Sequence, residues 1–293
     1  MGSLMMIGAA MGFGLSPMLA QMLLSEGFSP EVIALFRFGM PALLVLPYLK
    51  GFLQERGEYI RCIALGVFSA LGMLAFLYSF TWLPASRVIL AYYTYPLFAI
   101  LIGWLLFGHQ LTRNRLISAA LILLAVSVLQ DNSGASTSML WAGVIVFIAP
   151  ISYALLINYF ANPVKELKTG ERMCAMLIGH LLILIPLPFW QIPDIVIPQT
   201  TDQLGLILAL GLMAAALPQY LFAKGVTLAG MERSTMISTS EIVFALLFGV
   251  ALLGQEISRL EIIASALIVL ASLIRPEPDE PKARGWEIAE SSS

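Results

Sequence analysis

Ionisable side chains are rare inside the long apolar runs of this sequence, so the few that occur there are the first candidates for chemistry. Glu241 lies about ten residues into one run, or ~15 Å along a helix, and Arg37 about seven residues into another, or ~10 Å. A charged group at such depth in a membrane requires an opposite charge, a polar partner or water. We therefore expect Arg37 and Glu241 to interact, directly or through other polar groups. The alternative, in which Arg37 only braces helices through backbone carbonyl groups, stays open.

Polar and aromatic side chains gather in the same apolar runs, often beside a proline. Tyrosine combines an apolar ring with one polar group, which suits a cavity for an amphipathic zwitterion. The alternatives are an aromatic belt at the membrane surface for the tyrosines and close helix packing for the serines. The residues expected to line the cavity are Ser16, Tyr78, Tyr92, Tyr93, Tyr95, Ser152, Tyr153, Gln219, Tyr220, Ser238, Thr239 and Glu241.

Glycine and proline residues mark places where these helices are expected to bend. Glycine and proline both weaken a helix, and a proline also leaves one backbone carbonyl group without its helical partner. The stretch from Gly12 to Pro17 has the strongest pattern. Kinks of this kind are also common in bundles that do not move, so a hinge and a static kink both stay open. The expected hinge residues are Gly12, Gly14, Pro17, Pro96, Pro150 and Pro218.

The sequence offers little for catalysis or for a metal. His109 and His180 are isolated, and Glu241 has no acidic neighbour. An active site would require paired carboxylates, a cluster of metal ligands or a nucleophile beside a base. Cys62 and Cys174 lie in apolar runs without the spacing of a disulfide framework or a metal site. We therefore expect no cofactor, no metal and no catalytic residue, and we expect His180 to be hydrogen-bonded within the bundle.

Composition places these residues in a membrane protein. Of the 293 residues, 59% are hydrophobic and only 12% are charged, against about 25% charged in a soluble domain. The net charge of −2 gives no reason to expect nucleic-acid binding. The first apolar run has no basic leader or cleavage site, which favours a retained helix over a signal peptide. Ten runs are about long enough to cross a membrane: 2–24, 30–49, 60–81, 84–107, 115–130, 139–159, 172–190, 204–227, 231–253 and 259–274.

The distribution of lysine and arginine predicts how these runs are oriented. With the N-terminus in the cytoplasm, thirteen of these residues lie in cytoplasmic segments and only Arg87 and Arg259 lie outside. Cytoplasmic segments of membrane proteins are enriched in lysine and arginine. We therefore expect a multi-pass protein of the inner, or plasma, membrane with both termini in the cytoplasm.

The chain contains one pattern twice. A shift of about 146 residues places Arg87 on Arg233, Gly103 on Gly249 and Gly108 on Gly254. Five helices per half is an odd number, so the second half crosses the membrane in the opposite sense. Carriers with such inverted repeats bind their substrate near the middle of the membrane, between the halves. We expect an all-α membrane protein with ten transmembrane helices, in which 1–130 and 131–275 form two inverted five-helix repeats and 276–293 form a disordered cytoplasmic tail.

The repeated pattern resembles the drug/metabolite transporter superfamily, EamA type. The residues that carry the resemblance are Arg37, Tyr95–Phe98, Leu106–His109, Ser240–Phe244 and Leu253–Glu256. His109 and Gln255 stand where that family has glutamates, and Ile242 stands in place of its second proline. Any coupling role of those glutamates is therefore in doubt here. Among its branches, the ten-helix YddG-like amino-acid exporters are the suspected relatives.

The resemblance implies export by alternating access of small amphipathic metabolites, above all aromatic or hydrophobic amino acids. A uniporter and a proton antiporter both stay open, with Glu241 as the candidate coupling group. The alternatives are a multidrug or other-metabolite exporter of the same fold, a membrane-embedded enzyme, and a channel or scaffold. The partners expected are a small-molecule substrate and the lipid bilayer. The Gly8–Gly12 spacing suits dimerisation and packing within one chain equally, so a monomer is one of two possibilities.

Overall fold

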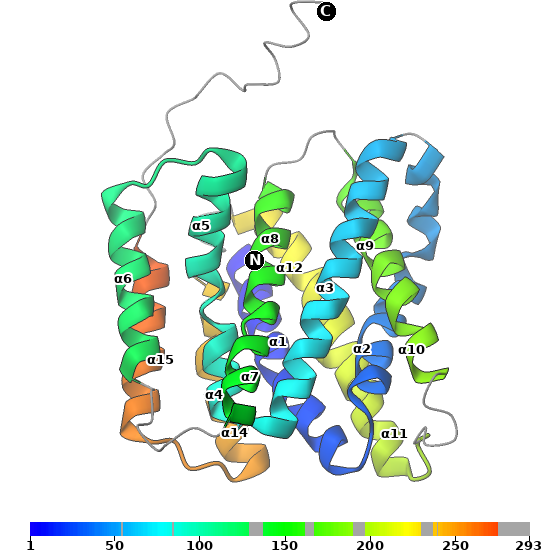
Figure 1. Cartoon of the computed structure of the whole chain (residues 1–293). Helices are drawn as coiled ribbons and strands as arrows, with labels where there is room; N and C mark the ends of the chain where they lie inside the picture. The colour runs from blue at the N-terminus through cyan, green and yellow to red at the C-terminus, as the bar shows by residue number, and fades with distance from the viewer. Residues whose placement is uncertain are drawn as a thin grey trace, which may run out of the picture.

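The protein is a bundle of helices standing side by side (Figure 1). The computed structural model describes residues 1–53, 55–83, 85–128, 137–161, 167–189, 197–229, 237–238 and 240–274, and all regular structure in these ranges is helical. The chain is an all-α membrane protein whose ten membrane-crossing segments form two inverted five-helix repeats, as predicted. Thr239 and the expected tail at 276–293 lie outside the described residues.

The first half begins with two helices joined by a tight turn at Gly27, whose φ is 88°. The second helix begins at Pro30 after Ser29, the helix-entry pair that the sequence contains. The elements of this half are α1 (Gly2–Ser25), α2 (Pro30–Val45) with η1 (Leu46–Leu53), α3 (Arg56–Trp82), α4 (Ala85–Tyr92), α5 (Tyr95–Phe107) and α6 (Arg113–Val128).

The second half repeats this plan. Its last helix begins with a capping box, in which Ser258 and Glu261 each bond the backbone of the other. The elements are α7 (Thr137–Ile145), α8 (Ile148–Ala161), α9 (Thr169–Leu184), α10 (Pro186–Phe189), α11 (Thr201–Leu208), η2 (Ala209–Ala216), α12 (Leu217–Ala229), α14 (Ser240–Leu253) and α15 (Arg259–Leu273).

Two runs expected as single helices are broken. Turns at Tyr93–Thr94 and at Val146–Phe147 separate α4 from α5 and α7 from α8. Each turn lies just before a proline, Pro96 or Pro150. Proline has no N–H to donate to the carbonyl group four residues earlier, so the helix is interrupted at that level.

The same helix end occurs in both halves. Gly108 and Gly254 have φ values of 68° and 62°, the left-handed conformation that glycine adopts most readily. The following residue donates its N–H back to the carbonyl group six residues earlier, from His109 to Gly103 at 2.9 Å and from Gln255 to Gly249 at 3.2 Å. This bond spans one residue more than the main bond of a Schellman motif, whose N–H reaches the carbonyl group five residues earlier. Gly103 and Gly249, and likewise Gly108 and Gly254, which a shift of about 146 pairs in sequence, are therefore also equivalent in structure.

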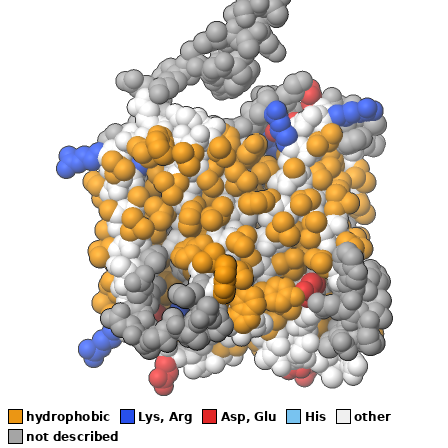
Figure 2. All heavy atoms as spheres, viewed as in Figure 1, with side chains coloured by type: hydrophobic (Ala, Val, Ile, Leu, Met, Phe, Trp, Pro, Cys, Tyr) orange, Lys and Arg blue, Asp and Glu red, His pale blue; other side chains and the backbone are white. Residues whose placement is uncertain are grey.

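The outer surface is apolar over most of its height. Figure 2 shows a broad band of hydrophobic side chains, with lysine, arginine and acidic side chains mainly at the two ends of the bundle. Six helical segments in the described part are long and apolar enough to cross a membrane: Gly2–Ser25, Pro30–Leu49, Arg56–Trp82, Arg87–Phe107, Trp141–Tyr159 and Thr201–Phe222. Such a band fits the hydrocarbon layer of a bilayer.

Candidate functional site

A cluster of tyrosines forms where α4 breaks from α5. Tyr92 ends α4, Tyr95 begins α5, and Tyr153 projects from α8. The ring centroids of Tyr92 and Tyr153 are 5.6 Å apart, and those of Tyr95 and Tyr153 are 4.9 Å apart at 84°. Phe76 of α3 adds a fourth ring, 5.3 Å from Tyr92. The broken helix thus brings side chains from three membrane-crossing segments together, as discontinuous helices do in other carriers.

A charged pair lies beside these rings. The Arg37 guanidinium of α2 is within electrostatic range of Glu241, Tyr92 and Tyr153. Glu241, in the first turn of α14, also interacts with the hydroxyl group of Tyr93. That contact falls short of an ordinary hydrogen bond, and the buried Arg37 Nε has no hydrogen-bond partner among the described residues. Arg37 and Glu241 are therefore near enough to influence one another electrostatically, and Arg37 keeps an unused donor among the described residues.

The residues of this cluster differ in how far they are exposed. Arg37, Tyr92, Tyr95, Tyr153 and Glu241 all keep part of their surface accessible, although they come from helices that face one another within the bundle. Tyr93, in the same turn as Tyr92, is only 3% exposed and packs in the apolar core. The arrangement can hold a small molecule with both charged and aromatic parts.

Gly14 sets the position of Glu241. A Cβ atom on Gly14 would lie 2.9 Å from the Glu241 carbonyl oxygen and 2.9 Å from the Ala245 nitrogen. Only a glycine lets the α1 backbone approach the first turn of α14 this closely. The residue predicted as a hinge therefore lies directly behind a predicted site residue.

His180 of α9 lies beside Phe38, next to the candidate site. Its ring lies 3.9 Å from the Phe38 ring, measured between centroids, and Phe38 is the neighbour of Arg37. Nδ1 is 2.8 Å from the Met176 carbonyl oxygen, and Nε2 is 3.1 Å from the Ser69 hydroxyl group of α3. The prediction that His180 is hydrogen-bonded within the bundle is confirmed.

Other predicted cavity residues lie apart from this cluster. Tyr220 is 53% exposed, with the Lys224 ammonium group 5.4 Å from its ring, so it belongs to the outer surface. Tyr78 donates a hydrogen bond to Glu31 and stacks on Trp82, nearer the end of α3.

The smaller polar residues are placed as follows. The Ser152 hydroxyl group donates to the Ala149 carbonyl oxygen at 2.9 Å, where α8 packs on α3. The Ser16 hydroxyl group is buried and has no hydrogen-bond partner among the described residues. Gln219 and Ser238 are partly exposed, and Thr239 lies outside the described residues.

Three buried carboxylates among the described residues, Glu31, Glu58 and Glu171, were missed by the sequence reasoning, which found only Glu241 deep in a run. Glu31 is 4% exposed and Glu58 is 6% exposed. Both lie in the first turn of a helix, where the backbone N–H groups favour a negative charge. They lie at the ends of apolar runs, where the sequence alone does not show that the fold buries them.

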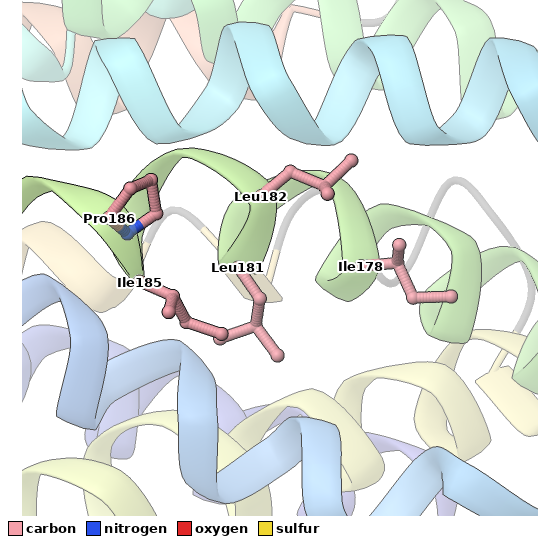
Figure 3. Close-up of a pocket in the computed structure, with 5 residues that line it drawn as sticks. All are labelled: Ile178, Leu181, Leu182, Ile185 and Pro186. Carbon is pink, nitrogen blue, oxygen red and sulfur yellow. The ribbon is translucent and has the colours of Figure 1, made fainter.

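The groove in Figure 3 is a different feature. It encloses about 290 Å³ along α9 and α10 and is lined by Ile178, Leu181, Leu182, Ile185 and Pro186. Leu182 is 58% exposed, and all five side chains are apolar. The groove therefore belongs to the apolar outer surface and not to the polar site.

Known proteins resemble this chain over most of its length. It is 25% identical over 247 residues to a biotin transporter of Escherichia coli strain K12, with 82% of this chain and 81% of the relative covered. It is 26% identical over 210 residues to an uncharacterized transporter of Archaeoglobus fulgidus, with 70% of each covered. A protein of known crystal structure superposes with a TM-score of 0.65 over 93% of this chain and 95% of its own, at 14% identity, which shows a shared fold alone.

The family match covers both halves. The EamA-like transporter family matches residues 1–130 and 140–274. These two stretches contain the repeated glycine caps, the broken helix and both members of the charged pair. The chain therefore belongs to the EamA-like transporter family of the drug/metabolite transporter superfamily.

Proposed function

We propose that this transporter carries amino acids with aromatic or hydrophobic side chains out of the cell by alternating access. The observation that carries the proposal is the pair of opposite charges, Arg37 and Glu241, beside a cluster of tyrosine rings. A free amino acid has the matching parts: a carboxylate, an ammonium group and an apolar body. The suspected YddG-like branch, an exporter of amino acids, agrees with this chemistry.

Each part of the substrate has a partner in the site. The guanidinium group of Arg37 offers a forked set of N–H donors to a carboxylate. The carboxylate of Glu241 receives the ammonium group, and the rings of Tyr92, Tyr95 and Tyr153 cover the side chain. Arg37, Glu241 and the two charged groups of the substrate all lose water when the substrate binds. Each of them then faces an opposite charge, so no buried charge is left without a partner.

A second candidate substrate class follows from the relatives. Biotin transporters are named among proteins 25% identical to this chain. A carboxylate with an apolar body and no ammonium group would use Arg37 and the rings but not Glu241. The two classes are therefore separated by Glu241→Gln, which should abolish uptake of an amino acid and spare uptake of a carboxylate such as biotin.

Direction and coupling form a further part of the proposal. A uniporter and a proton antiporter both agree with the site, because Glu241 is the only acidic group at the tyrosine cluster among the described residues. Transport that keeps its dependence on a pH gradient in Glu241→Gln would exclude this residue as the coupling group.

The charge pattern supports an inner-membrane location with both termini in the cytoplasm. Arg87 is then outside, and its repeat partner Arg233 is inside. Single cysteines introduced next to these positions, in a chain without its native cysteines, should react with a membrane-impermeant maleimide from opposite sides. Reaction from the same side would overturn the inverted topology.

The direct experiment is counterflow in proteoliposomes with a panel of twenty amino acids, biotin and several cationic drugs. We expect exchange of labelled for unlabelled aromatic or branched amino acids, and loss of exchange in Arg37→Gln. Tyr220→Phe is the matched control, because Tyr220 lies on the outer surface. Exchange of cationic drugs alone would sink the amino-acid assignment in favour of a multidrug exporter. Exchange of none of these compounds would overturn all three proposed substrate classes.

A further inference from the structure

The two halves of the molecule meet along a seam between α3 and α9. A Cβ atom on Gly66 would lie 2.0 Å from the Met176 carbonyl oxygen, and one on Gly179 would lie 2.1 Å from the Ile63 carbonyl oxygen. The two backbones therefore touch without intervening side chains. Figure 1 shows α3 and α9 running alongside one another at one side of the bundle.

One end of the seam carries a buried ion pair. Arg172 Nη2 of α9 is 3.8 Å from Glu58 Oε1 of α3, and the two side chains are only 11% and 6% exposed. Glu58 Oε2 also lies 3.7 Å from Arg61 Nη1, but the Arg61 side chain is 51% exposed. The inner partner is thus Arg172, and Arg61 lies at the rim.

The same end of the seam contains both cysteines of the chain. Cys62 lies one helical turn after Glu58, and Cys174 lies two residues after Arg172. Both thiols are free and buried, with 4% and 2% exposure. Tyr59, 1% exposed, interacts with both of them. Water therefore reaches neither thiol in this conformation.

The other end of the seam reaches the candidate site. Ser69 of α3 meets His180 of α9 at 3.1 Å, and His180 stacks on Phe38, next to Arg37. Along α3, about eleven residues separate Glu58 from Ser69, which is ~17 Å of helix. A separation of α3 from α9 at the ion pair would therefore open a path of that length to Arg37.

We propose that the Glu58–Arg172 pair is the latch of a gate, closed in this structure, at the end of the bundle that the charge pattern assigns to the cytoplasm. The inference rests on the alternating-access part of the proposed function. A buried ion pair suits a latch because the attraction between the two charges is only slightly larger than the free energy needed to remove both from water. When the seam opens, water hydrates both groups again, so the closed and open states stay close in free energy.

The two native cysteines report whether the seam is open. In membrane vesicles without substrate, a membrane-impermeant maleimide should label the wild-type chain slowly. Glu58→Gln and Arg172→Gln each take the inner ion-pair partner away from a buried charge, and in Arg172→Gln the Glu58 carboxylate keeps the exposed Arg61. The loss of the inner pair favours the hydrated, open seam. We expect labelling of Cys62 and Cys174 to become about tenfold faster in each variant, from the cytoplasmic face only, which corresponds to a change of about 1.4 kcal/mol.

Arg61→Gln is the matched control, because it removes the exposed partner of the same carboxylate and should leave the labelling rate within about twofold of wild type. The double variant Glu58→Gln/Arg172→Gln removes both charges and should label more slowly than either single variant. If a single variant fails to fold, as judged by its elution profile in detergent, the double variant takes its place in the labelling experiment.

Three results would overturn the latch. They are wild-type labelling rates in folded variants, faster labelling from the opposite face, and failure of the double variant to fold, which would make the pair a fixed part of the structure. Because no substrate is present, a wrong substrate assignment leaves this result unchanged. Conversely, if the seam stays closed in all variants while the chain exchanges amino acids, the latch is wrong and the proposed function is retained.

Discussion

Gly12 of α1 lies against the ring of Pro218 of α12, so closely that a Cβ atom on Gly12 would be 2.2 Å from the proline Cγ. The same Cβ atom would be 2.7 Å from the Met213 carbonyl oxygen. Residues Ala209–Ala216 form a π-helix, in which each N–H reaches the carbonyl group five residues earlier. Pro218 has no N–H to offer Met213, so this carbonyl group is left facing Gly12. Two separately predicted hinge residues thus form one contact.

Gly12→Ala should therefore destabilise the protein. The added methyl group has no space between α1 and α12, and overpacking of this kind costs about 1–3 kcal/mol. The expected result is a lower midpoint of thermal unfolding in detergent. Gly143→Ala in α7 is the control, because a Cβ atom there would meet nothing within 4 Å. Equal midpoints for both variants would show that α1 is free to move away from Pro218.

The sequence predicted the architecture well because the signals for it are local. The ten apolar runs and the helix start at Pro30 each depend on a few neighbouring residues. Gly108 and Gly254 were predicted as repeat partners, and their role as helix caps came from the structure. The breaks in α4–α5 and α7–α8 were only partly predicted. Pro96 and Pro150 were recognised as weak points, but whether a proline bends or ends a helix depends on the packing around it. Pro17 lies within the continuous helix α1.

The site was harder to predict because it depends on helix rotation and on distant pairing. Tyr220 lies two residues from Pro218, but its direction around the helix places it on the outer surface. Tyr78 was predicted to line the cavity as one of the tyrosines in the apolar runs. Its hydrogen bond to Glu31, 47 residues away, leaves no trace in the local sequence. The interaction of Arg37 with Glu241 was expected only because their depths in the membrane agreed.

The repeated caps predict matched effects in the two halves. Gly108→Ala and Gly254→Ala each force a side chain into the left-handed conformation, at a cost of about 1–2 kcal/mol. Because both glycines have open space around a Cβ atom, backbone strain is the only penalty at either site. We expect similar losses in the free energy of unfolding for the two variants. A loss in one half and none in the other would argue against equivalent caps.

The tyrosine cluster predicts that rings matter more than hydroxyl groups for the apolar part of the substrate. Tyr153 contacts both Tyr92 and Tyr95 through its ring. Tyr153→Phe should change the substrate KM by less than about threefold, whereas Tyr153→Ala should raise it by about tenfold or more, since each ring contact contributes about 0.5–1.5 kcal/mol. The measurement is uptake as a function of substrate concentration. Equal KM values for Phe and Ala would show that the substrate does not touch this ring.

The charged pair predicts coupling between Arg37 and Glu241. Either Arg37→Gln or Glu241→Gln leaves one charge in a largely apolar bundle without its partner, and each should reduce substrate affinity strongly. The double variant restores neutrality, so its loss should be smaller than the sum of the single losses, with a coupling free energy of about 0.5–3 kcal/mol. Binding of a labelled amino acid to the four purified proteins measures this cycle. If Arg37 and Glu241 bind the same substrate molecule, the effect of Arg37→Gln on affinity depends on whether Glu241 is present. A coupling free energy of zero would therefore mean that Arg37 serves only to brace the bundle.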